Sequence, residues 1–196
     1  MKQYSESCEQ NKAPILEVLK QVFHDSKNTF EVGSGTGQHA VYFAKHLPHL
    51  TWHPSDLKEN LLGIQAWLHD ASLENVKPPI EFDVLSPPVN LGRFDAVFTA
   101  NSLHIMSWSM VQAFFQVVSN LLEQQGKLLV YGPFSYQGAH TSLSNERFDL
   151  YLKQRNPDSG VRDFVDVDQL AKNEGLELVE DYAMPANNRS LLWQKC

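Results

Sequence analysis

The sequence has only two cysteines among its 196 residues, and they lie near its two ends. Cys8 and Cys196 form no CxxC pair and stand at no cysteine or histidine spacing typical of metal ligands. We therefore expect neither a metal site nor a disulfide framework. So little cysteine is what a protein of a reducing compartment shows, and we expect a cytoplasmic protein.

Long apolar runs and runs of positive charge are missing as well. No stretch approaches the roughly 18 uninterrupted apolar residues of a membrane span. The first residues, MKQYSESCEQNK, lack the apolar region of a secretion signal. The formal net charge is −7, and no cluster of lysine or arginine marks a surface for DNA or RNA. Membrane and nucleic-acid partners are therefore not expected.

What the sequence does contain is ordinary globular composition, with 42% apolar and 20% charged residues. A chain of this length favours one domain with a substantial core. No internal repeat or low-complexity linker divides it. We expect a single domain over 1–196, with an N-terminal helical segment over about 1–28 and a lid-like insert over about 135–163.

Strand and helix patterns alternate along the chain. Strands are expected over 29–32, 50–56, 79–85, from 93, over 127–134, and over 176–184 and 189–195. Helices are expected over about 14–24, 37–47, 57–71, 107–125, 143–155 and 166–174. Pro14 is placed at the first position of its helix, and Gly126 is expected to break the helix before it.

The alternation predicts an α/β fold with a mainly parallel sheet and helices on both faces. The short link of residues 185–188 between the last two strands predicts an antiparallel hairpin at the sheet edge. In such folds ligands bind at the carboxyl ends of the strands. Asp56, Asp83 and Asn101 each stand at the end of a successive strand, and a glycine turn follows the first.

That turn lies in EVGSGTGQHAVYFA, residues 31–44, where Gly33, Gly35 and Gly37 alternate with other residues. A dinucleotide fingerprint, GxGxxG, would need a third glycine at position 38, which is Gln38. A phosphate-binding P-loop would need a lysine after the glycines. The spacing therefore makes an NAD-dependent reductase a weaker alternative, and an ordinary tight turn stays open as another.

Asp56 follows 19 residues after Gly37, at the end of the second strand. A carboxylate in this place can accept hydrogen bonds from both hydroxyls of a ribose. It can also cap the helix that begins immediately afterwards. The two interpretations are both compatible with the sequence, and we favour the ribose contact.

The whole pattern resembles the class I S-adenosylmethionine (SAM)-dependent methyltransferases, and more narrowly a small family that includes the methyltransferase-like 26 protein. The stretches that carry the resemblance cover nearly the whole chain: NKAPIL, EVGSGTGQHAVYFA, HPSDL, FDAVFTANSLHI, LLVYGPF, SNERFDLYLKQRNPDSGVRDF and AMPANN. The last two are the most specific. Where that family has arginine before NK, the chain has Gln10, so no role of that arginine is carried over.

The resemblance implies a Rossmann-like, seven-stranded sheet of order 3-2-1-4-5-7-6 with strand 7 antiparallel. It also implies SAM as the cofactor, with Glu31 and the glycines beside the methionyl part, Asp56 at the ribose and Asp83 near the adenine. Cofactor contacts are thus expected from Asn11, Glu31, Gly33, Ser34, Gly35, Gly37, Asp56, Leu57, Asp83, Val84 and Asn101. Glu31 can equally orient the turn from behind, and Asp83 can equally be a turn residue.

The stretch ANSLHIMSW, residues 100–108, is expected to flank the transferred methyl group. Methyl transfer is an in-line displacement, and a base is needed only when the nucleophile carries a proton that must leave. Asn101 and His104 are the catalytic candidates, and Trp108 is a candidate apolar wall. Their plainer interpretations are a turn cap, a hydrogen-bonded helix residue and ordinary packing. The [ND]PPY pattern of many amino-group methyltransferases is missing.

Further substrate contacts are expected at the rim of the site, from Tyr4, Trp108, Tyr136, Arg162, Asn187 and Asn188. For most of these the plainer interpretation is a solvated surface or a turn former. The sequence thus predicts a SAM-dependent methyltransferase acting on a small-molecule acceptor. The alternative is a non-catalytic SAM-binding or protein-interaction module on the same fold.

Overall fold

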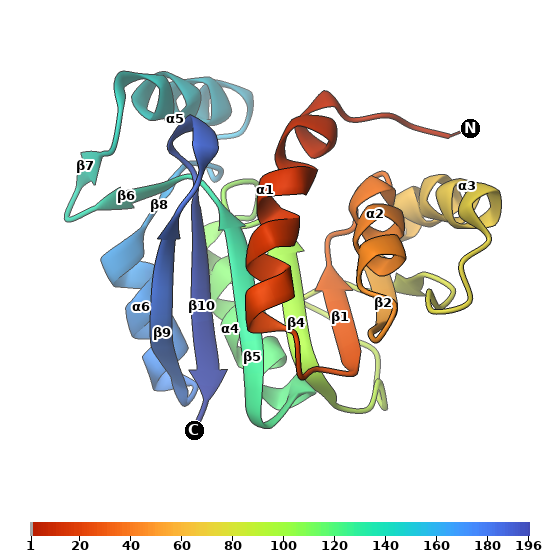
Figure 1. Ribbon diagram of the computed structural model, residues 1–196. Coiled ribbons are helices and arrows are strands. Elements are labelled where there is room, and N and C mark those ends of the chain that lie inside the picture. Colours follow the sequence, from red (N-terminus) through yellow and green to blue (C-terminus); the bar gives the residue numbers. More distant parts are fainter. Residues whose placement is uncertain (1) are drawn as a thin grey trace.

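A computed structural model describes residues 2–196, and a seven-stranded sheet forms its centre (Figure 1). The strands follow the order β3-β2-β1-β4-β5-β10-β9. Their bounds are β1 Asn28–Val32, β2 Thr51–Asp56, β3 Ile80–Glu81, β4 Phe94–Ala100, β5 Leu122–Gly132, β9 Leu176–Ala183 and β10 Arg189–Lys195. The first five pair in parallel, whereas β10 is antiparallel to both β5 and β9. The predicted order and the reversed seventh strand are confirmed.

Helices cover both faces of this sheet. They are α1 Glu6–Val22, α2 Gln38–His46, η1 Lys58–Asn60 (a 3-10 turn), α3 Leu61–Ala71, α4 Trp108–Leu121, α5 Leu143–Arg155 and α6 Phe164–Asn173. In Figure 1, α1 and α2 lie in front of the sheet, and α4 and α6 lie behind it. Within residues 2–196, no helix is both long enough and apolar enough to span a membrane.

Two apolar cores lie on the two faces of the sheet. Neighbouring residues of β4 serve different cores, because successive side chains of a strand point to opposite faces. Phe98 packs in the core with Ile15 of α1 and Phe43 of α2. Val97 packs in the other core, with Phe115 of α4. Burial on both faces explains why the central strands are almost continuously apolar.

The first helix begins eight residues earlier than Pro14, so the prediction that Pro14 is its first residue is wrong. Ser5 caps the helix with a side chain that accepts from the N–H of Cys8, and Glu6 and Glu9 place negative charge in the first turn. Pro14 lies inside the helix. The apolar period starts at Pro14 because the earlier turns cover no apolar core.

The fourth helix ends at Leu121, five residues before Gly126. The prediction that Gly126 ends this helix is therefore wrong. Instead, β5 begins at Leu122 and contains Gly126 in a bulge, where the pairing with β4 shifts from Leu122 to Lys127. Gln125, in the same bulge, has a φ of 65°.

The segment after β5 contains a second, three-stranded sheet, which the sequence pattern does not predict. Its order is β7-β6-β8, with β6 Phe134–Tyr136, β7 Ala139–His140 and β8 Arg162–Asp163. Strands of two or three residues are too short to display a period of two. The helix of this segment, α5, has the predicted bounds of 143–155. In Figure 1 it lies above the carboxyl end of β5.

Candidate functional site

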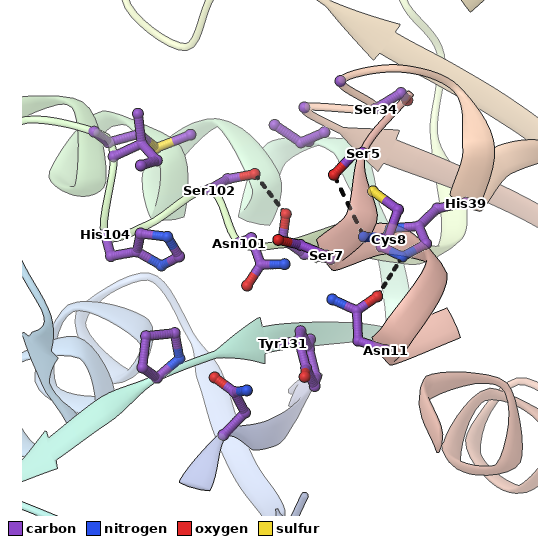
Figure 2. Close-up of a pocket in the computed structure, with 18 of the residues that line it drawn as sticks. Ser5, Ser7, Cys8, Asn11, Ser34, His39, Asn101, Ser102, His104 and Tyr131 are labelled. Carbon is purple, nitrogen blue, oxygen red and sulfur yellow. Dashed lines mark hydrogen bonds between the residues drawn. The ribbon is translucent and has the colours of Figure 1, made fainter. Parts of the chain in front are cut away.

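A cavity of about 860 Å³ opens at the carboxyl ends of β1, β2, β4 and β5. Its volume lies in the usual range for small-ligand sites, about 300–1,000 Å³. Its walls come from separate parts of the chain: the start of α1, the glycine turn, the loop after β4, helix α5 and the 185–188 link. Figure 2 shows several of these side chains facing one another. This is the edge of the sheet at which the sequence predicts a ligand.

The glycine turn needs its three glycines for different reasons, although all have positive φ, at 72°, 58° and 88°. A Cβ on Gly33 would lie 2.7 Å from the hydroxyl oxygen of Ser102, and one on Gly37 would lie 3.0 Å from the Cα of Ile64. Gly35 has no such neighbour within 4 Å. Gly33 and Gly37 therefore permit close packing, whereas Gly35 leaves its backbone open to the cavity. Gly37 is not among the residues that line the cavity.

Glu31 lies behind this turn, with only 2% of its surface exposed. Its Oε2 accepts hydrogen bonds from the hydroxyl of Ser34 at 2.8 Å and from the indole N–H of Trp52 at 2.9 Å. Burial raises the pKa of Glu31 to about 7, although these two bonds act in the opposite direction. Glu31 thus braces the turn and is not itself among the residues that line the cavity.

Asp56 joins the end of β2 to the glycine turn. Its Oδ2 accepts from the backbone N–H of Gly35 at 2.6 Å. Its Oδ1 accepts from the N–H of Leu57 and from the side-chain amide of Asn60, both at 2.7 Å. Asp56 and Leu57 both line the cavity. The carboxylate therefore holds the turn in place at the position predicted for a ribose.

The wall beside Asp56 comes from the residues that follow β3. Asp83 and Val84 line the cavity there, together with Phe82. The Oδ1 of Asp83 accepts from the N–H of Leu85 at 2.9 Å, which is the bond of a turn residue. We refer to the wall formed by 32–36, 56–57 and 82–84 as the glycine-turn half of the cavity.

The loop after β4 adjoins the glycine turn, and in it Asn101 has left-handed backbone geometry with a φ of 58°. Its N–H donates to the carbonyl of Tyr131 at 2.9 Å, which fixes the loop to the end of β5. Backbone conformations of this kind cost roughly 1–3 kcal/mol outside glycine and cluster at functional sites. Asn101 lines the cavity, as predicted for a residue at this strand end.

His104 lines the same cavity as Gly33 and Gly35. Its ring is buried and meets the edge of the Phe148 ring, with centroids 5.3 Å apart. Burial, and secondly the positive charge of Arg162, lower the pKa of His104 to about 4. The imidazole is therefore neutral at neutral pH and can accept a proton.

Residues 159–162 hold the loop that carries His104. The four consecutive carbonyls of 103–106 each accept a hydrogen bond from this segment, which we call the carbonyl clamp. The bonds run from Arg162 Nε to Leu103 O (3.1 Å), Gly160 N to His104 O (2.9 Å), Ser159 Oγ to Ile105 O (2.8 Å) and Arg162 Nη2 to Met106 O. The guanidinium of Arg162 therefore contacts backbone behind the loop, and Arg162 is not among the lining residues.

Two lining residues that the sequence pattern does not single out, His39 and Tyr131, lie near Asn11 (Figure 2). The Nε2 of His39 is 2.7 Å from the Oδ1 of Asn11. Burial lowers the pKa of His39 to about 4, so the ring is neutral. His39 and Tyr131 escaped prediction because both stand within apolar, core-like patterns.

Helix α5 and the 185–188 link close the cavity from above. The side-chain amide of Asn145 donates to the carbonyl of Asn187 at 2.9 Å, and the amide of Asn187 donates to the hydroxyl of Ser144 at 3.3 Å. Ala186 and Asn187 both have positive φ, at 56° and 58°. Asn187 and Asn188 line the cavity, in the region where rim residues are expected from the sequence.

Three other residues expected at the rim do not line the cavity. Tyr4 is 61% exposed and Trp108 is 37% exposed at the start of α4. Tyr136 stacks on Phe164 and donates its hydroxyl to Asp181 at 2.6 Å. Burial and Asp181 raise its pKa well above the ordinary value.

Comparison with known proteins agrees with this architecture. A family model described as "Protein of unknown function (DUF938)" matches residues 2–195. Among solved structures, an O-methyltransferase family protein from Burkholderia thailandensis superposes with a TM-score of 0.83 at 16% identity, over 97% of this chain and 57% of that one. Human N-acetylserotonin methyltransferase in complex with SAM gives 0.83 and 16%, over 97% and 53%. PigF with S-adenosylhomocysteine (SAH) gives 0.82 and 13%, over 95% and 56%.

These similarities concern the fold. The chain shares the Rossmann-like α/β fold of these solved methyltransferase structures, with a sheet of order β3-β2-β1-β4-β5-β10-β9. It spans little more than half the length of these methyltransferases, between 53% and 57%.

Proposed function

The chain belongs to the DUF938 family, and from that premise we propose that it is a SAM-dependent methyltransferase acting on a small-molecule acceptor. The narrower kinship, with the small family that includes the methyltransferase-like 26 protein, is part of the same proposal. The observation that carries the proposal is a single cavity lined by the open glycine turn, Asp56, Asn101 and His104.

The chain's own residues fit SAM. Gly35 presents its backbone to the cavity, so a bound group can approach the turn closely. SAM carries no phosphate, so the turn needs no positive charge to bind it. No lysine or arginine is among the residues that line the described cavity, which suits SAM better than a pyrophosphate. Gln38, which stands where the dinucleotide fingerprint has its third glycine, also argues against NAD. Its side chain accepts a hydrogen bond from the backbone N–H of Ser5 at 2.5 Å.

Each part of SAM then has candidate partners in the glycine-turn half. Asp56 would accept from the ribose hydroxyls, and Asp83 would accept from the adenine amino group beside Val84. The side-chain amide of Asn11, which lines the cavity, would donate to the carboxylate of the methionyl part. Glu31 does not line the cavity, so it would act on the ammonium group indirectly, through Ser34 of the turn that it braces.

SAM supplies an activated methyl group on a sulfonium, and the protein's contribution is to orient and desolvate the two reactants. Asn101 would hold the acceptor through its side-chain amide. His104 is neutral and would take the proton of an acceptor hydroxyl as the bond to the methyl carbon forms. The carbonyl clamp would keep the loop of both residues at the correct distance from the glycine turn.

The test has two stages. Calorimetry should show SAM and SAH binding more tightly than NAD; NAD binding more tightly than SAH would overturn the cofactor assignment. Transfer of label from methyl-tritiated SAM to a library of small metabolites should then reveal turnover. SAM binding without transfer to any acceptor would favour the second candidate, a non-catalytic SAM-binding or protein-interaction module.

A further inference from the structure

We infer that the methyl acceptor is an uncharged molecule, with an apolar body and neutral hydrogen-bonding groups. This inference rests on the proposed function and concerns the part of the cavity opposite the glycine turn. We call that part the acceptor half. It is lined by Asn101, His104, Met106, Met110, Tyr131, Pro133, Asn145, Phe148 and the 185–188 link.

The acceptor half contains no ionised side chain among the described residues that line it. Two lining residues carry carboxylates, Asp56 and Asp83, and both belong to the glycine-turn half. No lysine, arginine or glutamate lines either half within residues 2–196. An ionic group on the acceptor would therefore meet no opposite charge.

The two histidines of the cavity do not supply a charge either. His104 lies in the acceptor half and His39 beside Asn11, and burial is the main reason why the pKa of each falls to about 4. Both rings are therefore neutral at neutral pH. Neither offers an imidazolium to an acceptor carboxylate or phosphate.

The charged groups that lie behind the acceptor half are already engaged. The guanidinium of Arg162 donates to the carbonyls of Leu103, Met106 and Asp158. Asp149 accepts from Lys153 at 2.7 Å and from the N–H of Val161 at 2.8 Å. These charges stabilise the clamp and α5, and their bonds are directed toward protein atoms.

Neutral amides and apolar side chains form the surface that remains. Asn101, Asn145, Asn187 and Asn188 line this half, and an amide can both donate and accept. The side chains of Met106, Met110 and Phe148 form an apolar, adaptable wall between them. Burying an unpaired charge against such a surface costs several kcal/mol, whereas a hydroxyl or carbonyl finds partners.

The reaction that fits is methylation of a neutral hydroxyl. A lone pair of the hydroxyl oxygen forms the new C–O bond while the C–S bond of SAM breaks, and its electron pair stays on sulfur to give neutral SAH. The hydroxyl proton passes to the neutral ring of His104 and then to water. A neutral acceptor thus yields a neutral methyl ether.

The test can be made before the acceptor has been identified. The full chain is incubated with methyl-tritiated SAM and a deproteinised cell extract. After unreacted SAM, itself a cation, has been removed by chromatography, the labelled products are passed over anion and cation exchangers at neutral pH. We expect most of the product label in the unretained fraction, and stable to mild alkali. Label mainly on either exchanger would overturn the inference, as would label released as volatile methanol by alkali, because that identifies a carboxylate acceptor.

Absence of any labelled product, with SAM binding intact, would instead overturn the proposed catalytic function. The two failures are therefore distinguishable. Heat-inactivated protein is the control for non-enzymatic transfer.

A matched set of probes gives a second, direct measurement in the presence of SAH. 3-Hydroxybenzamide is neutral, 3-hydroxybenzoate is anionic and 3-hydroxybenzylamine is cationic, and the three have nearly the same size. Calorimetry should show the neutral probe binding at least about tenfold more tightly than either charged probe, a difference of about 1.4 kcal/mol. Equal or tighter binding of a charged probe would contradict the inference.

Charge placed into the acceptor half should change this preference. In the Asn188→Asp variant, binding of the cationic probe should improve at least about fivefold relative to the neutral one. The control is Asn173→Asp, an exposed position at the end of α6, away from the lining residues. An unchanged preference in the folded Asn188→Asp variant would contradict the assignment of this surface to the acceptor.

Discussion

The carboxylate of Asp56 accepts the backbone N–H of Gly35 at 2.6 Å, so one side chain connects β2 to the glycine turn that follows β1. The strands themselves are neighbours, with Val32 opposite Ser55. The turn is therefore held by strand pairing at its base and by Asp56 at its tip. This double attachment makes Asp56 the residue whose removal tests the site most directly.

Replacing Asp56 by alanine should weaken SAM binding by roughly 1–3 kcal/mol, because buried donors lose their acceptor. Calorimetry with SAM and a 2′-deoxy analogue separates a ribose contact from an effect on the turn alone. Wild type should bind the 2′-deoxy analogue more weakly than SAM, whereas Asp56→Ala should bind the analogue and SAM equally. An equal loss in both proteins would refute the ribose contact.

The glycines of the turn should respond differently to the same change. Gly37→Ala should cost roughly 2–4 kcal/mol of unfolding free energy, since positive φ and contact with the Ile64 backbone both oppose a Cβ. Gly35→Ala should cost only about 1–2 kcal/mol but should lower SAM affinity, because its Cβ enters the cavity. Denaturant unfolding and calorimetry measure the two effects. If Gly35→Ala and Gly37→Ala lost the same stability and Gly35→Ala left SAM affinity unchanged, the different roles of the two glycines would be refuted.

Glu31 should make stability depend on pH in an unusual direction. Its pKa in the folded protein, about 7, exceeds the ordinary 4.5, so between these values the folded state holds a proton that the unfolded state has lost. Stability from this group is full below pH 4.5 and decreases as pH rises toward 7, by roughly 3 kcal/mol in total.

Glu31→Gln removes this titration, since the amide oxygen can still accept from Ser34 and Trp52. The stability of wild type relative to Glu31→Gln should therefore fall between pH 4.5 and 7, as measured by denaturant unfolding across that range. A difference that is constant over the window would show that the folded-state pKa is not raised.

His104→Asn should lower turnover by about 10²-fold and leave SAM affinity unchanged if His104 takes the acceptor proton. Because the ring has a pKa of about 4, the wild-type rate should fall only as pH approaches 4 and not near 6.5. Initial rates across pH with the labelled acceptor give the profile. A turnover close to wild type in the variant would limit His104 to packing.

Arg162→Gln should release the loop of residues 103–106 without affecting the glycine-turn half of the cavity. We expect turnover to fall at least about tenfold, with SAM affinity unchanged, because a displaced loop loses its orientation toward the acceptor. The pKa of His104, followed by NMR, should rise because the guanidinium charge is gone. The control is Arg155→Gln, which removes an exposed donor to Tyr151. Equal effects of the two changes would argue against a specific role of the clamp.

The alternation of strands and helices could be predicted from the sequence, because most of the elements of the large sheet and its covering helices carry an apolar pattern. The bounds of α5 agree with the prediction, and the sheet order agrees with what the family resemblance implies. The predicted start of α1 and the predicted end of α4 are wrong, because helix ends depend on caps such as Ser5 and on burial, which a sequence pattern does not encode.

The candidate site was less predictable. The strand-end residues Asp56, Asp83 and Asn101 were found because parallel strands bring their carboxyl ends to one edge. His39 and Tyr131 were missed since their contribution depends on α1 folding over the sheet. Arg162 is predicted as a substrate contact at the rim, but its guanidinium donates to the carbonyls of a loop distant in sequence, a contact that no spacing reveals.

The walls of the cavity come from opposite ends of the sequence, with the first turns of α1 on one side and the 185–188 link on another. A molecule bound between them contacts both α1 and the hairpin of β9 and β10, so it connects these two elements for as long as it is bound. Neither element can detach while the cavity is filled, so occupancy should protect the backbone amides of both from hydrogen exchange. The protection should grow with the logarithm of ligand concentration, as it does for any ligand that binds the folded state alone.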